Sequence, residues 1–342
     1  VDFIIADCDT AITLLPRRWT AIENKDYDKV IGNRNTNRIN GQMARFIKTK
    51  TLLYAASPAY QEGSEFTYQQ AAVSALIAIV TSGGLSQVNS ANNDHLSFYS
   101  NELVINAAND HPEVIWYSVK IDNLNSWEKT NFPPSLYGAG RTNPSQNLVD
   151  AFPMADGTPV TLAKIQSNDP YSGRDPRLDL YIMRHGAVIP FQSGDKVITT
   201  SEGSQDALGS EDSNATLTGY YIRKFMNTRN VDLNPNKEIG GLHYYVYARQ
   251  TDLLLMFAEA ANEAVGPDVA LGGMSAKRVI NAIRERAGIT STAYVDGLNK
   301  EEMREMIRNE RRLELCFEEQ RFWDLRRWNL TDKMNEDIKG VR

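Results

Sequence analysis

The sequence has 342 residues, of which 42% are hydrophobic and 23% charged, and its formal net charge at pH 7 is −6. This length and composition are typical of a globular protein with one to three domains. A net negative charge does not indicate a nucleic-acid groove, so we expect no nucleic-acid partner. The longest purely apolar run, residues 253–258, is far shorter than the roughly 20 residues needed to span a membrane.

The first third of the chain predicts three helices. We expect them over 2–15, 40–57 and 67–82, because apolar side chains recur there at helical spacing. The first two stretches stop at prolines, which cannot continue a helix. The third begins at Thr67, which together with Gln70 has the form of a capping box.

The two cysteines, Cys8 and Cys316, match no metal or redox spacing. Both fall within apolar helical patterns, so we expect buried thiols. Val1 already lies inside the first amphipathic pattern, and we therefore expect further residues upstream of it in the natural protein.

The middle third, about 83–242, has a different character. Turn residues recur, helical periodicity vanishes, and short strand-like pieces appear at 114–119 and 220–225. Long ordered loops in a compact protein are usually functional, so we expect this region to carry the binding site.

The last third predicts helices again, over 245–264, 275–287 and 300–318. The first of these is apolar nearly all round and should be central and buried. Short helices that follow one another in pairs indicate a helix-hairpin solenoid.

Seven strings along the chain resemble motifs of the SusD/RagB family, and they occur in the family's order. They are KTKTLLYAASP (48–58), NLVDAFPMADG (147–157), RDPRL (174–178), GYYIRKF (219–225), DLLLMFAEAANE (252–263), INAIRERAG (280–288), and NERRLEL with RFWDLRRW (309–328). Each string alone is modestly specific, but seven in order over nearly the whole chain are strong evidence.

The resemblance implies a mainly α fold, in which tetratricopeptide-like helix pairs form a superhelical scaffold around a large irregular insertion with short strands. We divide the single SusD-like domain into a first helical part (1–82), a loop-rich ligand-binding region (83–242), a second helical part (243–330) and the start of a C-terminal segment (331–342). The family pattern extends beyond both ends of this chain.

The resemblance also implies a non-catalytic function. Family members are outer-membrane, cell-surface lipoproteins that capture oligosaccharides, starch among them, and deliver them to a SusC-like TonB-dependent transporter. The membrane anchor would be a lipid outside this chain. Two alternatives remain: capture of oligopeptides for such a transporter, and a helical-repeat scaffold that binds only proteins.

For ligand binding we favour the loop at 122–143, because exposed aromatic rings can stack on sugar faces while amides and arginine bond hydroxyl groups. The predicted ligand-binding residues are Trp127, Phe132, Tyr137, Asn125 and Arg141. Asn123, Asn143, Phe98 and Tyr99 are secondary candidates.

Other charged patterns receive structural interpretations. The block at 308–327 has acids and arginines on what reads as one continuous helical stretch, so we interpret it as an ion-pair network between helices and not as the paired carboxylates of a glycoside hydrolase. In RDPR (174–177) we expect Asp175 to fix a turn while an arginine bonds carbonyls or carboxylates. No cofactor is expected, although Asn92, Asn93 and Asp94 form a candidate calcium loop.

Overall fold

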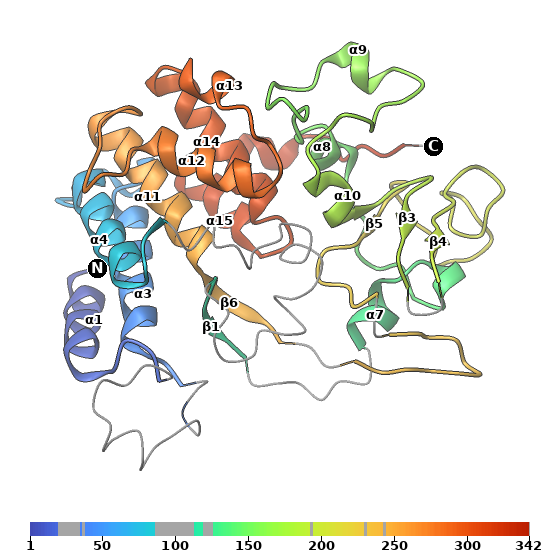
Figure 1. Cartoon of the computed structure of the whole chain (residues 1–342), viewed down its shortest axis with the longest axis horizontal. Coiled ribbons are helices and arrows are strands. Elements are labelled where there is room, and N and C mark those ends of the chain that lie inside the picture. The colour runs from blue at the N-terminus through green and yellow to red at the C-terminus, as the bar shows by residue number, and fades with distance from the viewer. Residues whose placement is uncertain are drawn as a thin grey trace.

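The computed structural model describes residues 1–19, 35, 38–85, 113–118, 126–191, 194–228, 231–241 and 244–341. Two regions lie side by side in it: a helical scaffold, built from the first and last thirds of the chain, and a loop-rich region built from the middle third (Figure 1). The protein is therefore mainly helical with a large irregular insertion, as predicted. None of the described helices is both long and apolar enough to cross a membrane.

The scaffold is organised around one buried helix. Its main helices are α1 (Asp2–Leu14), α3 (Gly41–Ala55), α4 (Tyr68–Thr81), α11 (Gln250–Val265), α12 (Ala276–Arg286), α14 (Lys300–Glu314) and α15 (Gln320–Arg327). Helix α11 packs against α3, α4, α12 and α14, and residues 250–262 of it are all buried. A helix that is apolar nearly all round can bury all of its faces only in such a central position.

Side chains that cap the helices set several of their boundaries. Thr67 and Gln70 form the predicted capping box at the start of α4, and Asn299 with Glu302 forms a second one at the start of α14. Each box satisfies two backbone N–H groups that the first helical turn leaves without partners.

The predicted helix at 245–264 begins too early. Residues Val246–Arg249 form strand β6, which pairs antiparallel with β1 (Val114–Tyr117), and α11 starts only at Gln250. Tyr and Val favour extended backbone, and pairing with a partner more than 100 residues away decides their conformation.

The predicted helix at 300–318 is interrupted as well. Helix α14 ends at Glu314, and α15 starts at Gln320 after a turn over 315–319. Two residues of this turn, Phe317 (φ 64°) and Glu319 (φ 61°), have left-handed backbone although neither is glycine. Such conformations are uncommon and persist only where the surroundings enforce them.

The loop-rich region contains only short elements. They are α7 (Ser126–Asn131), α8 (Gln146–Val149), α9 (Leu162–Ile165), α10 (Arg177–Tyr181), β2 (Ile182–Met183), β3 (Val188–Ile189), β4 (Lys196–Val197) and β5 (Tyr221–Ile222). Strand β2 pairs with β5 and β3 with β4, both antiparallel. The strand predicted at 220–225 is thus present but shorter.

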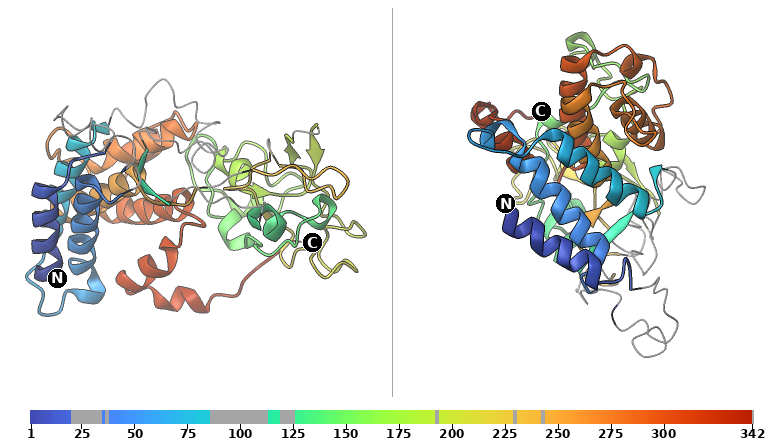
Figure 2. Two further views of the ribbon diagram at one scale, coloured as in Figure 1. Left: turned by 90° about the horizontal axis from the view of Figure 1, so that it is seen from below. Right: turned by 90° about the vertical axis from the view of Figure 1, so that its left-hand side faces the viewer.

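Three apolar clusters hold the molecule together. The largest fills the scaffold, and another, which includes Phe132, Met183 and Ile222, lies within the loop-rich region. Between them a third cluster joins Tyr181 and Tyr220 to Leu313 of α14. After α15 the chain returns to the loop-rich region, as Figure 2 shows, and residues 339–341 form backbone hydrogen bonds with residues 146 and 218.

Candidate functional site

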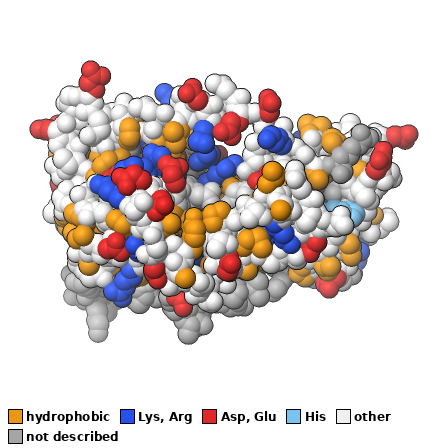
Figure 3. Space-filling view, turned by 90° about the horizontal axis from the view of Figure 1, so that it is seen from above, with side chains coloured by type: hydrophobic (Ala, Val, Ile, Leu, Met, Phe, Trp, Pro, Cys, Tyr) orange, Lys and Arg blue, Asp and Glu red, His pale blue; other side chains and the backbone are white. Residues whose placement is uncertain are grey.

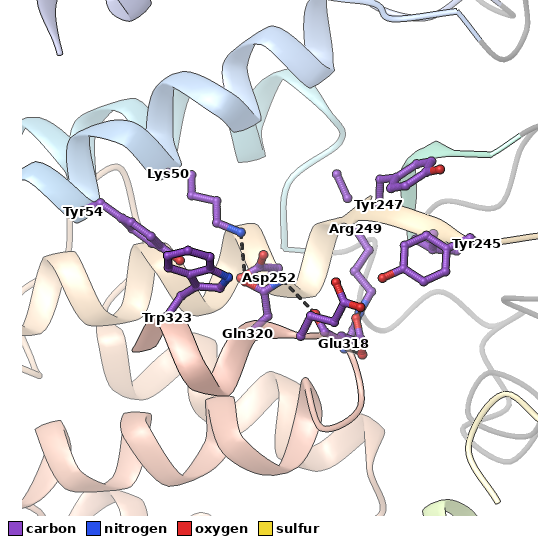
Figure 4. Close-up of a pocket in the computed structure, with 12 residues that line it drawn as sticks. Lys50, Tyr54, Tyr245, Tyr247, Arg249, Asp252, Glu318, Gln320 and Trp323 are labelled. Atoms are coloured by element: carbon purple, nitrogen blue, oxygen red, sulfur yellow. Dashed lines mark hydrogen bonds and ion pairs between the residues drawn. The ribbon is translucent and has the colours of Figure 1, made fainter. Parts of the chain in front are cut away.

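A pocket of about 430 Å³ opens where helix α3, strand β6 and the turn before α15 meet (Figure 4). We call it the aromatic pocket. It is lined by Lys50, Tyr54, Tyr245, Val246, Tyr247, Ala248, Arg249, Asp252, Glu318, Glu319, Gln320 and Trp323. These residues come from three stretches that are far apart in the sequence.

Aromatic rings stand at two ends of the aromatic pocket. Tyr54 and Trp323 lie on one side of the polar residues in Figure 4, and Tyr245 and Tyr247 lie on the other. Trp323, Tyr245 and Tyr247 are 49%, 42% and 49% exposed, which is high for such large apolar surfaces. Tyr247 also stacks on Trp116 of the neighbouring strand, with ring centroids 4.6 Å apart. Exposed rings held in this way can pack on the flat apolar faces of a ligand.

Between the rings lies a polar floor. The ammonium of Lys50 donates a hydrogen bond to Oε1 of Gln320 at 2.9 Å, and the Gln320 amide donates to the Glu318 carbonyl at 3.0 Å. Asp252 pairs with Arg311 at 3.1 Å. The floor is therefore rigid, because most of its polar groups are fixed by partners within the protein.

Arg249 has no donor left for a ligand. Its Nε and both terminal nitrogens make five hydrogen bonds, to the carboxylates of Glu113, Glu314 and Glu318 and to the Glu314 carbonyl. A guanidinium has five N–H groups, so these bonds use all of them. Burial alone would raise the pKa of Glu318, but Arg249 and Lys224 outweigh it, and the pKa is lowered.

The same two cations fix the turn that shapes the pocket edge. Lys224 is buried, and its ammonium donates to the carbonyls of Glu314 and Cys316 and to the Glu318 carboxylate. Arg249 holds the Glu314 carbonyl from the other side. These bonds satisfy carbonyl groups that the end of α14 leaves free, which accounts for the left-handed backbone on either side of Glu318.

Beneath the pocket, a buried ion-pair network joins the scaffold to the loop-rich region. Glu314 is fully buried and pairs with Arg177, Arg249 and Arg286 at 2.8–3.0 Å. A second group of ion pairs connects α11 to α14 and α15: Arg311 with Asp252 and Asp324, and Arg327 with Glu259 and Asp324. The predicted ion-pair network between helices is confirmed.

The geometry predicted for the charged block is wrong in one respect. Glu314 and Glu318 do not lie on the surface of one continuous helix; α14 ends at Glu314, and that side chain has no exposed area. Buried charges need several partners to offset the loss of hydration, and the arginines supply them.

The RDPR string has the predicted structural role. Asp175 accepts hydrogen bonds from the backbone and side chain of Arg177, and Arg177 also reaches Glu310 of α14 at 2.5 Å. Arg174 donates to the carbonyls of Val149, Phe152 and Pro170.

Three of the predicted ligand-binding residues lie on the surface of the loop-rich region. Trp127 is 38% exposed on α7, Tyr137 is 55% exposed with left-handed backbone (φ 64°), and Arg141 is exposed. The loop folds back on α7, because Ala139 and Arg141 donate backbone hydrogen bonds to the carbonyls of Lys129 and Thr130. They therefore belong to one well-supported loop, separate from the residues that line the aromatic pocket.

The remaining candidates divide into buried residues and residues outside the described part. Phe132 is 1% exposed, and its ring packs edge-on against Phe191 at 5.4 Å, so it supports the loop from inside. The Asn143 amide bonds the backbone of Gly140 and Leu217. Asn125, Asn123, Phe98, Tyr99 and the calcium candidates at 92–94 lie outside the described residues.

The sequence did not predict the aromatic pocket, although one of its strands has a recognisable pattern. Tyr245 and Tyr247 alternate with Val246 and Ala248, a period of two that predicts a strand with one aromatic face. Trp323 lies within the charged block at 308–327, and no local sequence pattern indicates that it approaches α3.

Neither thiols nor metal ligands form a further site in the described part of the chain. Cys8 and Cys316 are free and buried, as predicted. Within the described residues, no three His, Cys, Asp or Glu side chains gather to hold a metal ion. On the face shown in Figure 3, acidic and basic side chains intermingle with apolar ones.

Residues 101–341 match the family model described as the SusD family. The chain belongs to the SusD family. Among its relatives, SusD-like protein P25 of Formosa agariphila is 26% identical over 217 residues, which cover 63% of this chain and 35% of that protein. SusD-like protein P2 of the same organism is 34% identical over 95 residues, 26% of this chain and 18% of that protein.

Solved structures share the fold of this SusD-family chain. A SusD-like protein from Bacteroides fragilis superposes with a TM-score of 0.72 at 24% identity, over 100% of this chain and 62% of its own. A SusD-like carbohydrate-binding protein from the same species gives 0.64 at 21% identity, over 97% and 58%. A protein crystallised with a xylogluco-oligosaccharide gives 0.56 at 16% identity, over 97% and 57%. The chain thus spans about three fifths of the length of these structures, and a smaller share of the two Formosa relatives.

Proposed function

We propose that this SusD-family protein binds glycans without cleaving them and delivers them to a SusC-like TonB-dependent transporter. It would act at the cell surface, on the outer membrane, through a lipid anchor outside this chain. The observation that carries the proposal is the aromatic pocket, where exposed rings flank a fixed polar floor.

Sugar recognition needs both kinds of surface at once. The apolar faces of a sugar ring pack on aromatic side chains, while its hydroxyl groups need donors and acceptors at fixed positions. Trp323 and Tyr245 supply the first surface, and Lys50 and Glu319 supply the second. The loop that carries Trp127, Tyr137 and Arg141 offers a second surface of the same composition, and we propose that it contacts the same or a longer glycan.

Two structural neighbours support the proposal by analogy. One is described as a carbohydrate-binding SusD-like protein, and another was crystallised with a xylogluco-oligosaccharide. Both share the fold with this chain.

The state of the buried carboxylates favours binding over hydrolysis. A glycosidase needs two carboxyl groups that face each other across a cleft and reach the scissile bond. Glu310 and Glu314 have no exposed area and are held by Arg177, so they cannot reach a substrate. Of the carboxylates that line the pocket, Asp252 is paired with Arg311 and Glu318 with Arg249 and Lys224, which leaves Glu319 without a facing partner for hydrolysis.

Isothermal titration against a panel of plant and host oligosaccharides tests the proposal. We expect saturable binding of one glycan class in the micromolar range or weaker, because open, wet sites gain modest net free energy. Trp323→Ala should weaken binding about tenfold or more, which corresponds to about 1.4 kcal/mol. Tyr60→Ala is the control, because Tyr60 is 47% exposed and does not line the pocket.

Other outcomes would select other functions. Binding of peptide mixtures but of no glycan would favour peptide capture. Binding of neither would favour a protein-binding scaffold. Sugar release from an incubated glycan would contradict the non-catalytic proposal. Co-purification from detergent-solubilised outer membranes tests the transporter, and its absence would contradict delivery but not glycan binding.

A further inference from the structure

The charges of the aromatic pocket are unevenly distributed, and this restricts the ligands that it accepts. Three carboxylates line it, Asp252, Glu318 and Glu319, against two cations, Lys50 and Arg249.

Arg249 cannot bind an anion, and Lys50 by itself supplies too few converging donors for an anion-binding site. Carboxylates and sulfates are best held by guanidinium groups or by several free N–H donors that converge on them. All five donors of Arg249 are already bonded to Glu113, Glu314 and Glu318. Lys50 has three donors, and one of them goes to Gln320.

Of the three carboxylates, Glu318 is bonded to Arg249 and Lys224 and Asp252 is paired with Arg311, so Glu319 is the one that a ligand can use. Glu319 is exposed and forms no ion pair with any described residue. Its left-handed backbone holds it at the pocket edge between Glu318 and Gln320. A carboxylate accepts hydrogen bonds only, so it suits a ligand hydroxyl and repels a ligand anion.

The arrangement of the rings bears on ligand length. Tyr54 and Trp323 come from α3 and α15, whereas Tyr245 immediately precedes β6 and Tyr247 lies near its start, and the polar floor lies between the two pairs (Figure 4). Rings at two ends of a pocket can pack on two different sugar units at once.

We propose that the aromatic pocket binds an internal stretch of two or more units of an uncharged, hydroxyl-rich glycan and rejects glycans that carry carboxylates or sulfates. This inference rests on the proposed function and specifies its ligand. Lys50 donates to hydroxyl or ring oxygens, Glu319 accepts from hydroxyl groups, and the two ring pairs pack on successive sugar faces.

The test compares a glycan with its own charged derivative. The neutral polysaccharide that binds best in the titration panel is oxidised selectively, so that its primary alcohols become carboxylates while its backbone stays the same. At low salt we expect the oxidised polymer to bind at least about tenfold more weakly, and the difference to shrink as salt screens the repulsion. Equal or tighter binding of the oxidised polymer overturns the inference.

One variant separates the charge effect from changes in folding. Glu319→Asn removes the charge at an exposed position, and asparagine tolerates the left-handed backbone there. We expect tighter binding of the oxidised polymer and nearly unchanged binding of the neutral one. Glu211→Gln removes an exposed charge outside the pocket and serves as the control. An unchanged preference in Glu319→Asn contradicts the role of the pocket acids.

Oligosaccharides of increasing length test the second part of the inference. Affinity should rise sharply from one unit to two or three, and Trp323→Ala and Tyr245→Ala should each reduce that rise. Equal affinity for one unit and for longer chains overturns the two-ended arrangement.

The possible outcomes distinguish a failure of this inference from a failure of the proposed function. If only naturally acidic glycans bind, the inference is wrong and glycan capture stands. If no glycan of either kind binds, both are wrong.

Discussion

Arg177 and Glu310 meet inside the protein, with Nη1 and Oε1 2.5 Å apart and both side chains fully buried, although one belongs to the loop-rich region and the other to helix α14. Arg177 also pairs with Asp175 and Glu314. The loop-rich region is therefore fixed to the scaffold by charge as well as by apolar packing.

Replacing Arg177 with methionine should destabilise the protein strongly. Arg177→Met leaves three buried carboxylates without this cation, and breaking a buried pair from one side costs about 3–5 kcal/mol. Denaturant titration measures the loss. Arg184→Met removes a partly exposed pair with Asp179 and should cost no more than about 1 kcal/mol. Equal losses in the two variants would contradict the role of the buried network.

Acid should destabilise the protein through the same network. The pKa of Glu318 is lowered because Arg249 and Lys224 outweigh the opposing effect of burial, and the pKa of Asp324 is lowered in the same way by Arg311 and Arg327. An unfolded glutamate has a pKa of about 4.3. The stabilisation is therefore complete above that pH and is lost as the pH falls from there towards the lowered folded values.

The free energy of unfolding, measured between pH 3 and 7, checks this prediction. Glu318→Gln should lower stability at neutral pH and reduce its decline below pH 4–5. An identical acid decline in the variant would show that Glu318 does not contribute.

The predicted loop surface is tested by Trp127→Ala. If the loop contributes to glycan binding, the variant should weaken it several-fold, because an exposed ring stacked on a ligand contributes about 0.5–1.5 kcal/mol. Titration calorimetry measures the change, and Tyr60→Ala is a control of similar exposure outside both surfaces. Full affinity in Trp127→Ala, together with a loss in Trp323→Ala, would place the site in the aromatic pocket alone.

Gly138 lets the same loop fold back on itself. A Cβ atom there would lie 2.1 Å from the Phe132 carbonyl oxygen, so Gly138→Ala should cost about 1–3 kcal/mol, as overpacking does. At Gly297 the nearest atoms would be 3.7 Å away, and Gly297→Ala should be tolerated. Thermal unfolding compares the two, and a stable Gly138→Ala would mean that the loop can move.

The buried thiols should be unreactive in the folded protein. Burial raises the pKa of Cys316 to about 12 and also raises that of Cys8, so little reactive thiolate forms at pH 8. A thiol-specific chromogenic reagent should titrate two cysteines in denaturant and almost none without it. Rapid reaction of the native protein would contradict the burial of one or both.

The helices could be predicted because their determinants are local. Apolar spacing and the capping box of Thr67 and Gln70 act within a few residues, and α4 forms where they place it. The all-round apolar pattern likewise identified α11 as the central helix, although its first residues became a strand through pairing with β1.

The break between α14 and α15 could not be predicted in this way. Residues 315–319 contain neither glycine nor proline, and their pattern continues the helix. Lys224 and Arg249, more than 60 residues upstream, hold the free carbonyls and Glu318 and so determine the turn.

The sequence by itself determined the helical class, the loop-rich middle region, the structural role of the RDPR string and, through ordered motifs, the family. Only the tertiary structure decided which aromatic residues stand together. Lys50, Tyr245 and Trp323 approach one another because three distant segments pack around α11 and the buried ion pairs. Periodicity reports the face on which a side chain lies, but long-range packing alone decides what that face meets.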